Sequence, residues 1–153
     1  MDLIFWRHAE ARDPEDGQED LSRPLTSRGE KQAARMATWL DRQLPEGTRV
    51  LVSPAVRCEQ TAMALSRKFK LRQELAPDGE VGQILEIAQW PSAKNPVLLV
   101  GHQPVLGRVI AQLLALSASE CAVRRGSVWW LRNREREGNS QTVIVTVQSP
   151  ELL

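Results

Sequence analysis

Two histidines and two arginines are the residues of this sequence best placed to do chemistry, because each follows a short apolar run. Arg7 and His8 come directly after Leu-Ile-Phe-Trp, Arg57 comes shortly after Val-Leu-Val-Ser-Pro, and His102 follows Val-Leu-Leu-Val-Gly. The chain has no other histidine. Guanidinium groups match the oxygens of phosphate, and an imidazole nitrogen can accept a phosphoryl group. The set therefore indicates a phosphate site with a histidine nucleophile.

The elements that must position these residues alternate along the chain. Apolar runs typical of buried strands are followed by stretches with the apolar spacing of helices. We expect strands at 3–6, 49–53, 71–75 and 97–100, helices at about 26–43, 55–69, 81–89 and 104–116, and two further strands at 127–131 and 142–147. This alternation predicts a single α/β domain with a mostly parallel central sheet and helices on both faces.

The expected sheet brings the four residues together at one edge. In open α/β sheets, ligands bind outside the carboxyl ends of the strands, where the following helices begin. Both histidines lie at such ends, so we expect them to share one anion pocket with the arginines. Two histidines that contact one phosphate should lie within about 10 Å of each other, since hydrogen bonds of ~3 Å extend on either side of the anion.

Two polar segments are expected outside the regular elements. Residues 12–23 contain Pro and Gly and have no apolar period, so they predict a loop. Residues 132–139 are rich in charge, and we expect a solvated connection between the last two strands rather than a binding patch.

Composition excludes several classes of protein. The chain of 153 residues has 20 basic and 19 acidic side chains, so it lacks the basic excess usual in proteins that bind nucleic acid. Its apolar runs are far shorter than the roughly 20 residues of a membrane span. Charge follows Met1–Trp6 at once, which disfavours a secretory signal, and we expect a cytoplasmic protein. Cys58 and Cys121 form no C-x-x-C pair, so two reduced, mostly buried thiols are expected.

Other phosphate and ester chemistries lack their sequence patterns here. The segment 101–108 does not have the spacing or the terminal Lys-Ser/Thr of a P-loop. Neither Cys58 nor Cys121 is followed by arginine as a cysteine phosphatase loop requires, and no G-x-S-x-G segment occurs. Two histidines are too few for a typical catalytic zinc site. We therefore expect neither a metal nor a cofactor.

Four segments together resemble the histidine phosphatase superfamily, whose fold is shared with cofactor-dependent phosphoglycerate mutase. In chain order they are Arg-His-Ala at 7–9, Leu-Thr-Ser-Arg-Gly-Glu-Lys-Gln-Ala at 25–33, Ser-Pro-Ala-Val-Arg-Cys-Glu-Gln-Thr-Ala at 53–62, and Val-Gly-His at 100–102. Any one of them alone is a weak indication, but their order and number are specific. The resemblance implies a phosphoglycerate-mutase-like fold, with residues 1–153 as one histidine phosphatase domain.

The same resemblance implies a role for each of the four residues. His8 occupies the position of the nucleophile that becomes phosphorylated. Arg7 and Arg57 would bind the phosphoryl oxygens, and His102 would complete the pocket and stabilise the transferring group. Fixed cations of this kind can stabilise phosphoryl transfer without a metal. Neighbouring arginines should also help to keep His8 unprotonated.

Within the superfamily, the short chain and two further segments resemble the phosphohistidine phosphatase, or SixA, branch. These segments are Ser-Arg-Pro-Leu-Thr at 22–26 and Pro-x-Gly-x-Val-Gly at 77–82. The branch removes phosphate from histidine on the phosphotransfer domain of a signalling relay, which implies a phosphorylated protein as partner and signal transduction as the setting. We expect a monomer, with Arg23 either a further phosphate contact or a surface residue.

The sequence departs from the superfamily pattern where many members carry a carboxylate that protonates the leaving oxygen. Asp78 and Glu80 are the candidates for this acid, although an Asp-Gly pair is more often a turn. The acidic segment 13–20 could supply a proton or meet a basic partner. Two alternative functions stay open: a phosphatase for small phosphomonoesters, which would depend on such an acid, and a phosphate-binding module without turnover.

Overall fold

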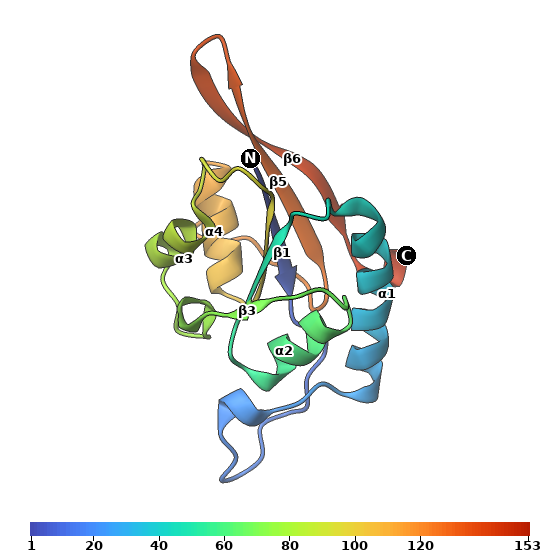
Figure 1. Cartoon of the computed structure of the whole chain (residues 1–153). Coiled ribbons are helices and arrows are strands. Elements are labelled where there is room, and N and C mark those ends of the chain that lie inside the picture. Colours follow the sequence, from blue (N-terminus) through green and yellow to red (C-terminus); the bar gives the residue numbers. More distant parts are fainter.

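A six-stranded sheet forms the centre of the computed structural model, which describes residues 1–153 (Figure 1). The strands lie in the order β3-β2-β4-β1-β5-β6. The elements are β1 (Asp2–Arg7), η1 (Asp20–Ser22), α1 (Ser27–Gln43), β2 (Arg49–Val52), α2 (Val56–Met63), β3 (Lys70–Leu71), η2 (Gln73–Leu75), α3 (Val81–Ala88), β4 (Val97–Gly101), α4 (Val105–Leu113), β5 (Val128–Arg136), β6 (Asn139–Gln148) and η3 (Pro150–Leu152), where η marks a 3-10 helix.

Strand pairing confirms the predicted α/β fold. β1, β2, β3 and β4 run parallel, while β5 and β6 are antiparallel additions at one edge. The two strands that end in histidine, β1 and β4, are direct neighbours, with Arg7 opposite Gly101 in the register. The carboxyl ends of these two strands therefore deliver their following residues to the same point.

The buried runs of β1 and β4 separate two apolar layers. Ile4 and Trp6 pack with the inner faces of α1 and α2, whereas Leu3 and Phe5 pack with those of α3 and α4. Because consecutive strand residues point to opposite faces, a run that is apolar without interruption needs helices on both sides. The structure confirms this arrangement. None of its helices is both long and apolar enough to cross a membrane.

Helix α1 begins where the sequence predicts, and its first turn packs on the chain that follows β1. The Thr26 hydroxyl accepts a hydrogen bond from the Gly29 amide at 3.0 Å and donates one to the Glu10 carboxylate at 2.7 Å. A methyl group on Gly29 would lie 2.0 Å from the Glu10 carbonyl oxygen. Only glycine allows this approach, so Gly29 sets the distance between α1 and the segment after His8.

Two predicted helices are longer than the structure has them. Helix α2 ends at Met63 rather than at 69, and Ser66 has a φ of 55°. The Arg67 guanidinium donates to the carbonyls of Leu44 and Pro45 beyond the end of α1, which draws the chain out of its helical path. Similarly, α4 ends at Leu113 instead of 116.

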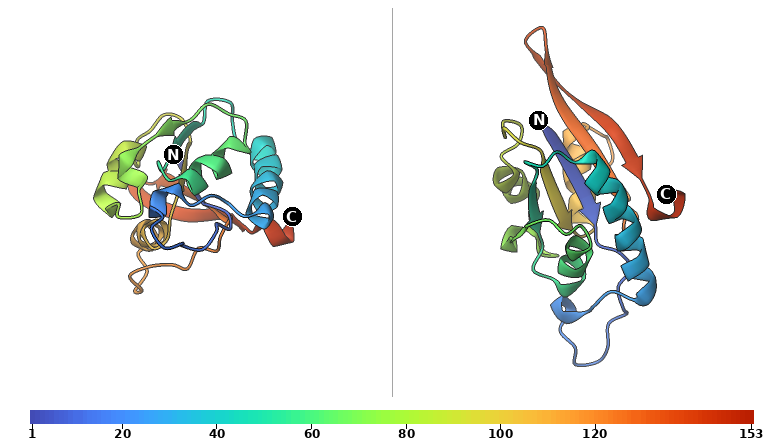
Figure 2. Two further views of the ribbon diagram at one scale, coloured as in Figure 1. Left: turned by 90° about the horizontal axis from the view of Figure 1, so that it is seen from below. Right: turned by 45° about the vertical axis from the view of Figure 1, so that its right-hand side comes forward.

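The other corrections concern strands and loops. Residues 71–75 are mostly the 3-10 turn η2, and β3 has only two residues. The segment 132–139, predicted as a connection, lies almost wholly in β5 and β6, which meet in a tight turn at Glu137 and Gly138, both with positive φ. The hairpin extends beyond the body of the molecule (Figure 2). A charged sequence can form it because two paired strands satisfy each other's backbone hydrogen bonds and need no apolar face for that.

Replacement of Gly29 by alanine should destabilise the protein by about 1–3 kcal/mol, because the new methyl group meets backbone that cannot move freely. Gly82 provides the matched control: it lies in helix α3 with no atom within 4 Å of the added methyl group. Gly82→Ala should stabilise by about 0.5–1 kcal/mol. Urea denaturation of both variants measures the difference, and equal effects would contradict the close packing at Gly29.

Candidate active site

The two histidines lie together at the carboxyl edge of the central strands, which is the lower edge in Figure 1. Their ring centroids are 5.3 Å apart, well within the expected limit. They border a small surface cavity of about 190 Å³. Its lining residues are Arg7, His8, Ala11, Asp13, Arg23, Arg57, Pro77, His102, Gln103 and Arg125.

The His8 ring is nearly buried and uncharged, with one nitrogen bound to the backbone. Its Nδ1 lies 2.7 Å from the carbonyl oxygen of Ala9. A carbonyl only accepts hydrogen bonds, so Nδ1 carries the proton and Nε2 keeps its lone pair. Burial lowers the pKa of His8 to about 4, and the charges of Arg57, Arg7 and Arg23 contribute further. His8 is therefore a neutral imidazole with an unprotonated Nε2 at neutral pH.

Hydrogen bonds from three other elements fix the backbone around His8. The Ala9 amide donates to Thr61 Oγ1, and the Glu10 amide donates to the side-chain carbonyl of Gln32. On the other side, the Gly126 amide donates to the carbonyl oxygens of residues 7 and 8. The segments at 25–33 and 53–62 thus contribute structural residues that hold the loop after β1.

The two central arginines each have a buried N–H group without a hydrogen-bond partner. Arg7 Nη1 donates to the Val123 carbonyl at 2.8 Å, while Arg57, only 3% exposed, donates from Nη1 and Nη2 to the carbonyl and carboxylate of Asp20. The Nε–H groups of both arginines are buried without a hydrogen-bond partner. A buried donor left unpaired is unfavourable by about 1–3 kcal/mol. Both arginines also line the cavity, where their positive charges favour an anion.

His102 is the second buried imidazole, and two side chains contact it. Its Nε2 lies 2.7 Å from Ser53 Oγ and 3.4 Å from Cys58 Sγ. Burial lowers the pKa of His102 to about 3, and the neighbouring His8, Arg57 and Arg7 act in the same direction. Burial also raises the pKa of the Cys58 thiol to about 12, so this sulfur stays protonated and unreactive.

All five basic residues singled out in the sequence line the cavity, whereas the two proposed acids do not. Neither Asp78 nor Glu80 belongs to the lining, although their neighbour Pro77 does. Asp13, from the predicted loop, does line it. No group of three or more His, Cys, Asp or Glu side chains is placed to hold a metal ion.

Two residues that line the cavity were not found from the sequence. Gln103 directly follows His102 and could have been included on that ground. Arg125 precedes β5, and because β5 is antiparallel its amino end lies at the carboxyl edge of the parallel strands. Asp20, from the acidic segment 13–20, bridges Arg57 and Arg23 at 2.9 and 3.0 Å. Its contact with Arg57 joins distant segments, so no local pattern reveals it.

An α/β sheet that ends in two neutral histidines and a group of arginines defines a class of phosphate-handling enzymes. Residues 3–78 match the family model described as the histidine phosphatase superfamily (branch 1). The chain belongs to the histidine phosphatase superfamily, and it is a phosphatase.

Individual relatives agree with this assignment. The chain is 35% identical over 121 residues to the phosphohistidine phosphatase SixA of Escherichia coli, covering 74% of each chain. It is 31% identical over 129 residues to the SixA homologue of Haemophilus influenzae, covering 74% of this chain and 77% of that one. A solved structure of the protein histidine phosphatase SixA with tungstate superimposes with a TM-score of 0.80 at 27% identity, covering 99% of both chains.

The two depressed histidine pKa values predict how stability responds to acid. An unfolded histidine binds a proton near pH 6.5, but His8 and His102 in the folded protein do so only near 4 and 3. Between these limits the unfolded chain holds more protons, so the free energy of unfolding should fall as the pH drops from about 6.5 toward 4. For each ring, the free energy of unfolding should fall by up to about 1.4 kcal/mol per pH unit in this range. Above about pH 6.5 the stability that depends on the two neutral rings is fully present.

Proton NMR of the imidazole resonances tests this directly, because only two histidines contribute. Between pH 8 and 5 neither resonance should move by more than about a tenth of its full titration shift, and titration of either ring near 6.5 would refute the depressed pKa. Urea denaturation at pH 7 and 5 should show a smaller loss of stability for His8→Asn than for the unsubstituted protein.

Proposed function

We propose that this protein hydrolyses phosphohistidine on a partner protein, through a phosphorylated His8 intermediate. The observation that carries the proposal is an unprotonated His8 Nε2 on a residue that lines one small cavity together with Arg7, Arg57 and His102. The similarity to SixA supports the substrate class, and tungstate, which that relative binds, is a tetrahedral oxyanion like phosphate.

The first step transfers the phosphoryl group to the enzyme. Its oxygens accept hydrogen bonds from Arg7 and Arg57, and His8 Nε2 forms a bond to phosphorus as the bond from phosphorus to the substrate nitrogen breaks. The departing imidazole gains a proton from water. A phosphoramidate leaves readily once its ring is protonated, so a dedicated acid matters less here than for an alkyl ester.

The second step regenerates the enzyme. Water attacks phosphorus, the bond between phosphorus and Nε2 breaks, and inorganic phosphate forms while a water proton goes to solvent. His102, whose ring lies beside that of His8, stabilises the charge on the phosphoryl oxygens in both steps. The Ala9 carbonyl keeps the proton on Nδ1, so Nε2 is the nitrogen that reacts each time.

The shape of the cavity favours a substrate on a protein surface. Its volume of about 190 Å³ is below the roughly 300–1,000 Å³ of sites that enclose small-molecule ligands. A phosphorylated side chain that projects from a partner needs to insert only its ring and phosphoryl group. We therefore favour a histidine phosphotransfer domain of a signalling relay as the substrate, with no metal in the reaction.

The substrate can be tested in one comparison, performed in EDTA. A phosphorylated histidine phosphotransfer domain should lose its phosphate rapidly, whereas p-nitrophenyl phosphate should be hydrolysed slowly. Preference for p-nitrophenyl phosphate would support a phosphomonoesterase instead, and there the amides Asp78→Asn and Glu80→Gln should reduce activity. No release from either substrate would support a binding module.

Replacement of His8 and of Arg57 should have different effects. His8→Ala removes the atom that accepts the phosphoryl group, so turnover should vanish while tungstate still binds through the arginines and His102. Arg57→Ala removes a charged contact to ground and transition states alike, so anion affinity and rate should fall together, by roughly ten- to a hundredfold.

Calorimetry with tungstate and single-turnover kinetics measure the two quantities separately. Arg42→Ala, an exposed change in the last turn of α1, serves as control and should alter neither. Substantial turnover by His8→Ala would refute the covalent mechanism.

A further inference from the structure

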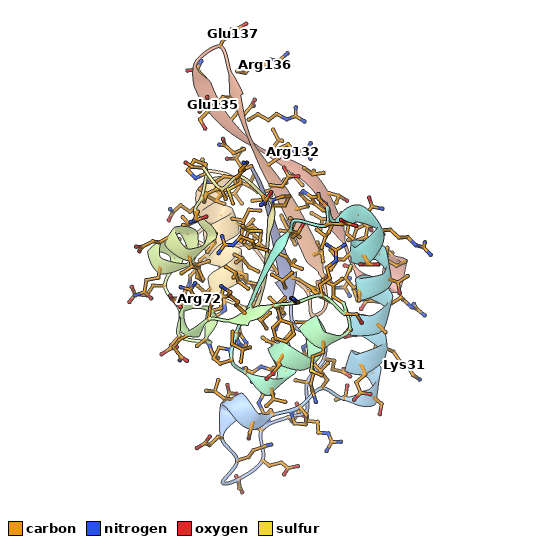
Figure 3. All side chains as sticks on the ribbon, viewed as in Figure 1. Lys31, Arg72, Arg132, Glu135, Arg136 and Glu137 are labelled. Atoms are coloured by element: carbon orange, nitrogen blue, oxygen red, sulfur yellow. The ribbon has the colours of Figure 1, made fainter.

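An exposed basic strip lies on the outer face of α1. Arg28, Lys31 and Arg35 are exposed and lie three and four positions apart, so they share one side of the helix. None of them forms a salt bridge in the structure. Figure 3 shows Lys31 directed away from the body of the molecule. We call these three residues the α1 basic strip.

The α1 basic strip borders a shallow surface hollow of about 250 Å³ beside the carboxyl end of the chain. The hollow is also lined by Gln32, Pro150 and Glu151. Glu151 is its only acidic side chain, so three positive charges face one negative charge. A surface with an excess of unpaired cations attracts an acidic partner.

Two residues that line this hollow also contact the segments around the active site. The Gln32 side chain accepts a hydrogen bond from the Glu10 amide, two residues beyond His8. Gln32 and Pro150 both pack against Gly126, whose amide binds the His8 carbonyl. Arg125, the next residue, lines the catalytic cavity. A partner protein whose surface extends from the cavity past Gly126 would therefore meet the α1 basic strip.

The charge around the cavity is one-sided. The exposed segment that follows Ala11 carries Asp13, Glu15, Asp16 and Glu19. An acidic partner surface is attracted by α1 and repelled by this segment, so the two regions select one orientation of the partner.

We infer that the α1 basic strip is a docking surface for an acidic patch beside the phosphorylated histidine of the partner protein. This inference rests on the proposed function, since it assumes a protein substrate. Exposed charges at the rim of an interface act mainly on the rate of association and on its salt dependence. The strip should therefore raise kcat/KM for acidic substrates without changing the chemical step.

Synthetic peptides with a central phosphohistidine provide the test. One peptide carries four glutamates on the amino side of the phosphohistidine, a second carries them on the carboxyl side, and a third carries glutamines instead. Each is assayed with the unsubstituted protein, with Lys31→Glu/Arg35→Glu, and with Arg134→Glu/Arg136→Glu. The last variant makes the same change in charge on exposed residues of the β5–β6 hairpin.

At about 50 mM salt, the unsubstituted protein should hydrolyse one acidic peptide about five- to tenfold faster, in kcat/KM, than the glutamine peptide. Lys31→Glu/Arg35→Glu should abolish this preference, the hairpin variant should retain it, and about 0.5 M salt should remove it. Equal rates for all peptides, or a preference that survives in Lys31→Glu/Arg35→Glu, would overturn the inference.

Phosphoimidazole, which carries no flanking residues, separates this inference from the proposed function. All three proteins should hydrolyse it at the same rate. If none hydrolyses phosphoimidazole or any peptide, the proposed function fails. In that case, binding of the peptides measured by calorimetry still tests the docking surface. At least one of the two acidic peptides must bind more weakly to Lys31→Glu/Arg35→Glu than to the hairpin variant.

Discussion

The removal of two imidazoles from water is the interaction on which the rest of this structure depends. A histidine at the surface would be partly protonated at neutral pH and a poor nucleophile, whereas burial shifts His8 far enough that its ring stays neutral. Burial also places strict demands on the surroundings, because every buried backbone group near the ring needs a partner. Thr61, Gln32 and Gly126 meet this demand. The recurrent motif residues are thus explained by packing and hydrogen bonding around one ring.

The arrangement of charge follows from the same requirement. Arginines close to His8 favour its neutral form and bind anions, but they also repel one another. Asp20 relieves this repulsion, because its carboxylate joins Arg57 to Arg23 while its carbonyl fixes the Arg57 guanidinium. Burial acts to raise the pKa of Asp20, yet the hydrogen bonds from the two arginines lower it overall. A protein with almost no net charge can in this way keep a strongly cationic site.

Much of the fold and of the site could be predicted from local sequence, and the exceptions have physical causes. The uninterrupted apolar runs of β1 and β4 predict two buried parallel strands with a histidine after each. That these two strands are direct neighbours, which brings His8 and His102 together, is seen only in the assembled sheet. The end of α2 depends on Arg67 contacting carbonyls beyond α1, which no helical pattern contains. Arg125 reaches the cavity only because β5 is antiparallel, a property of the assembled sheet.

The β5–β6 hairpin has a consequence for the colloidal behaviour of the protein. The sheet ends at β6, so one side of this strand has backbone groups without a neighbouring strand. Residues 139–148 carry no charge, and Ile144, Val145 and Val147 are exposed. Such edges can pair with strands of other molecules and begin aggregation. The charged side chains of β5 lie opposite residues 139–143 and oppose such pairing along the outer half of this strand. Ile144 and Val147 lie opposite Leu131 and Trp129, so the charge of the hairpin leaves the inner half of the edge unprotected.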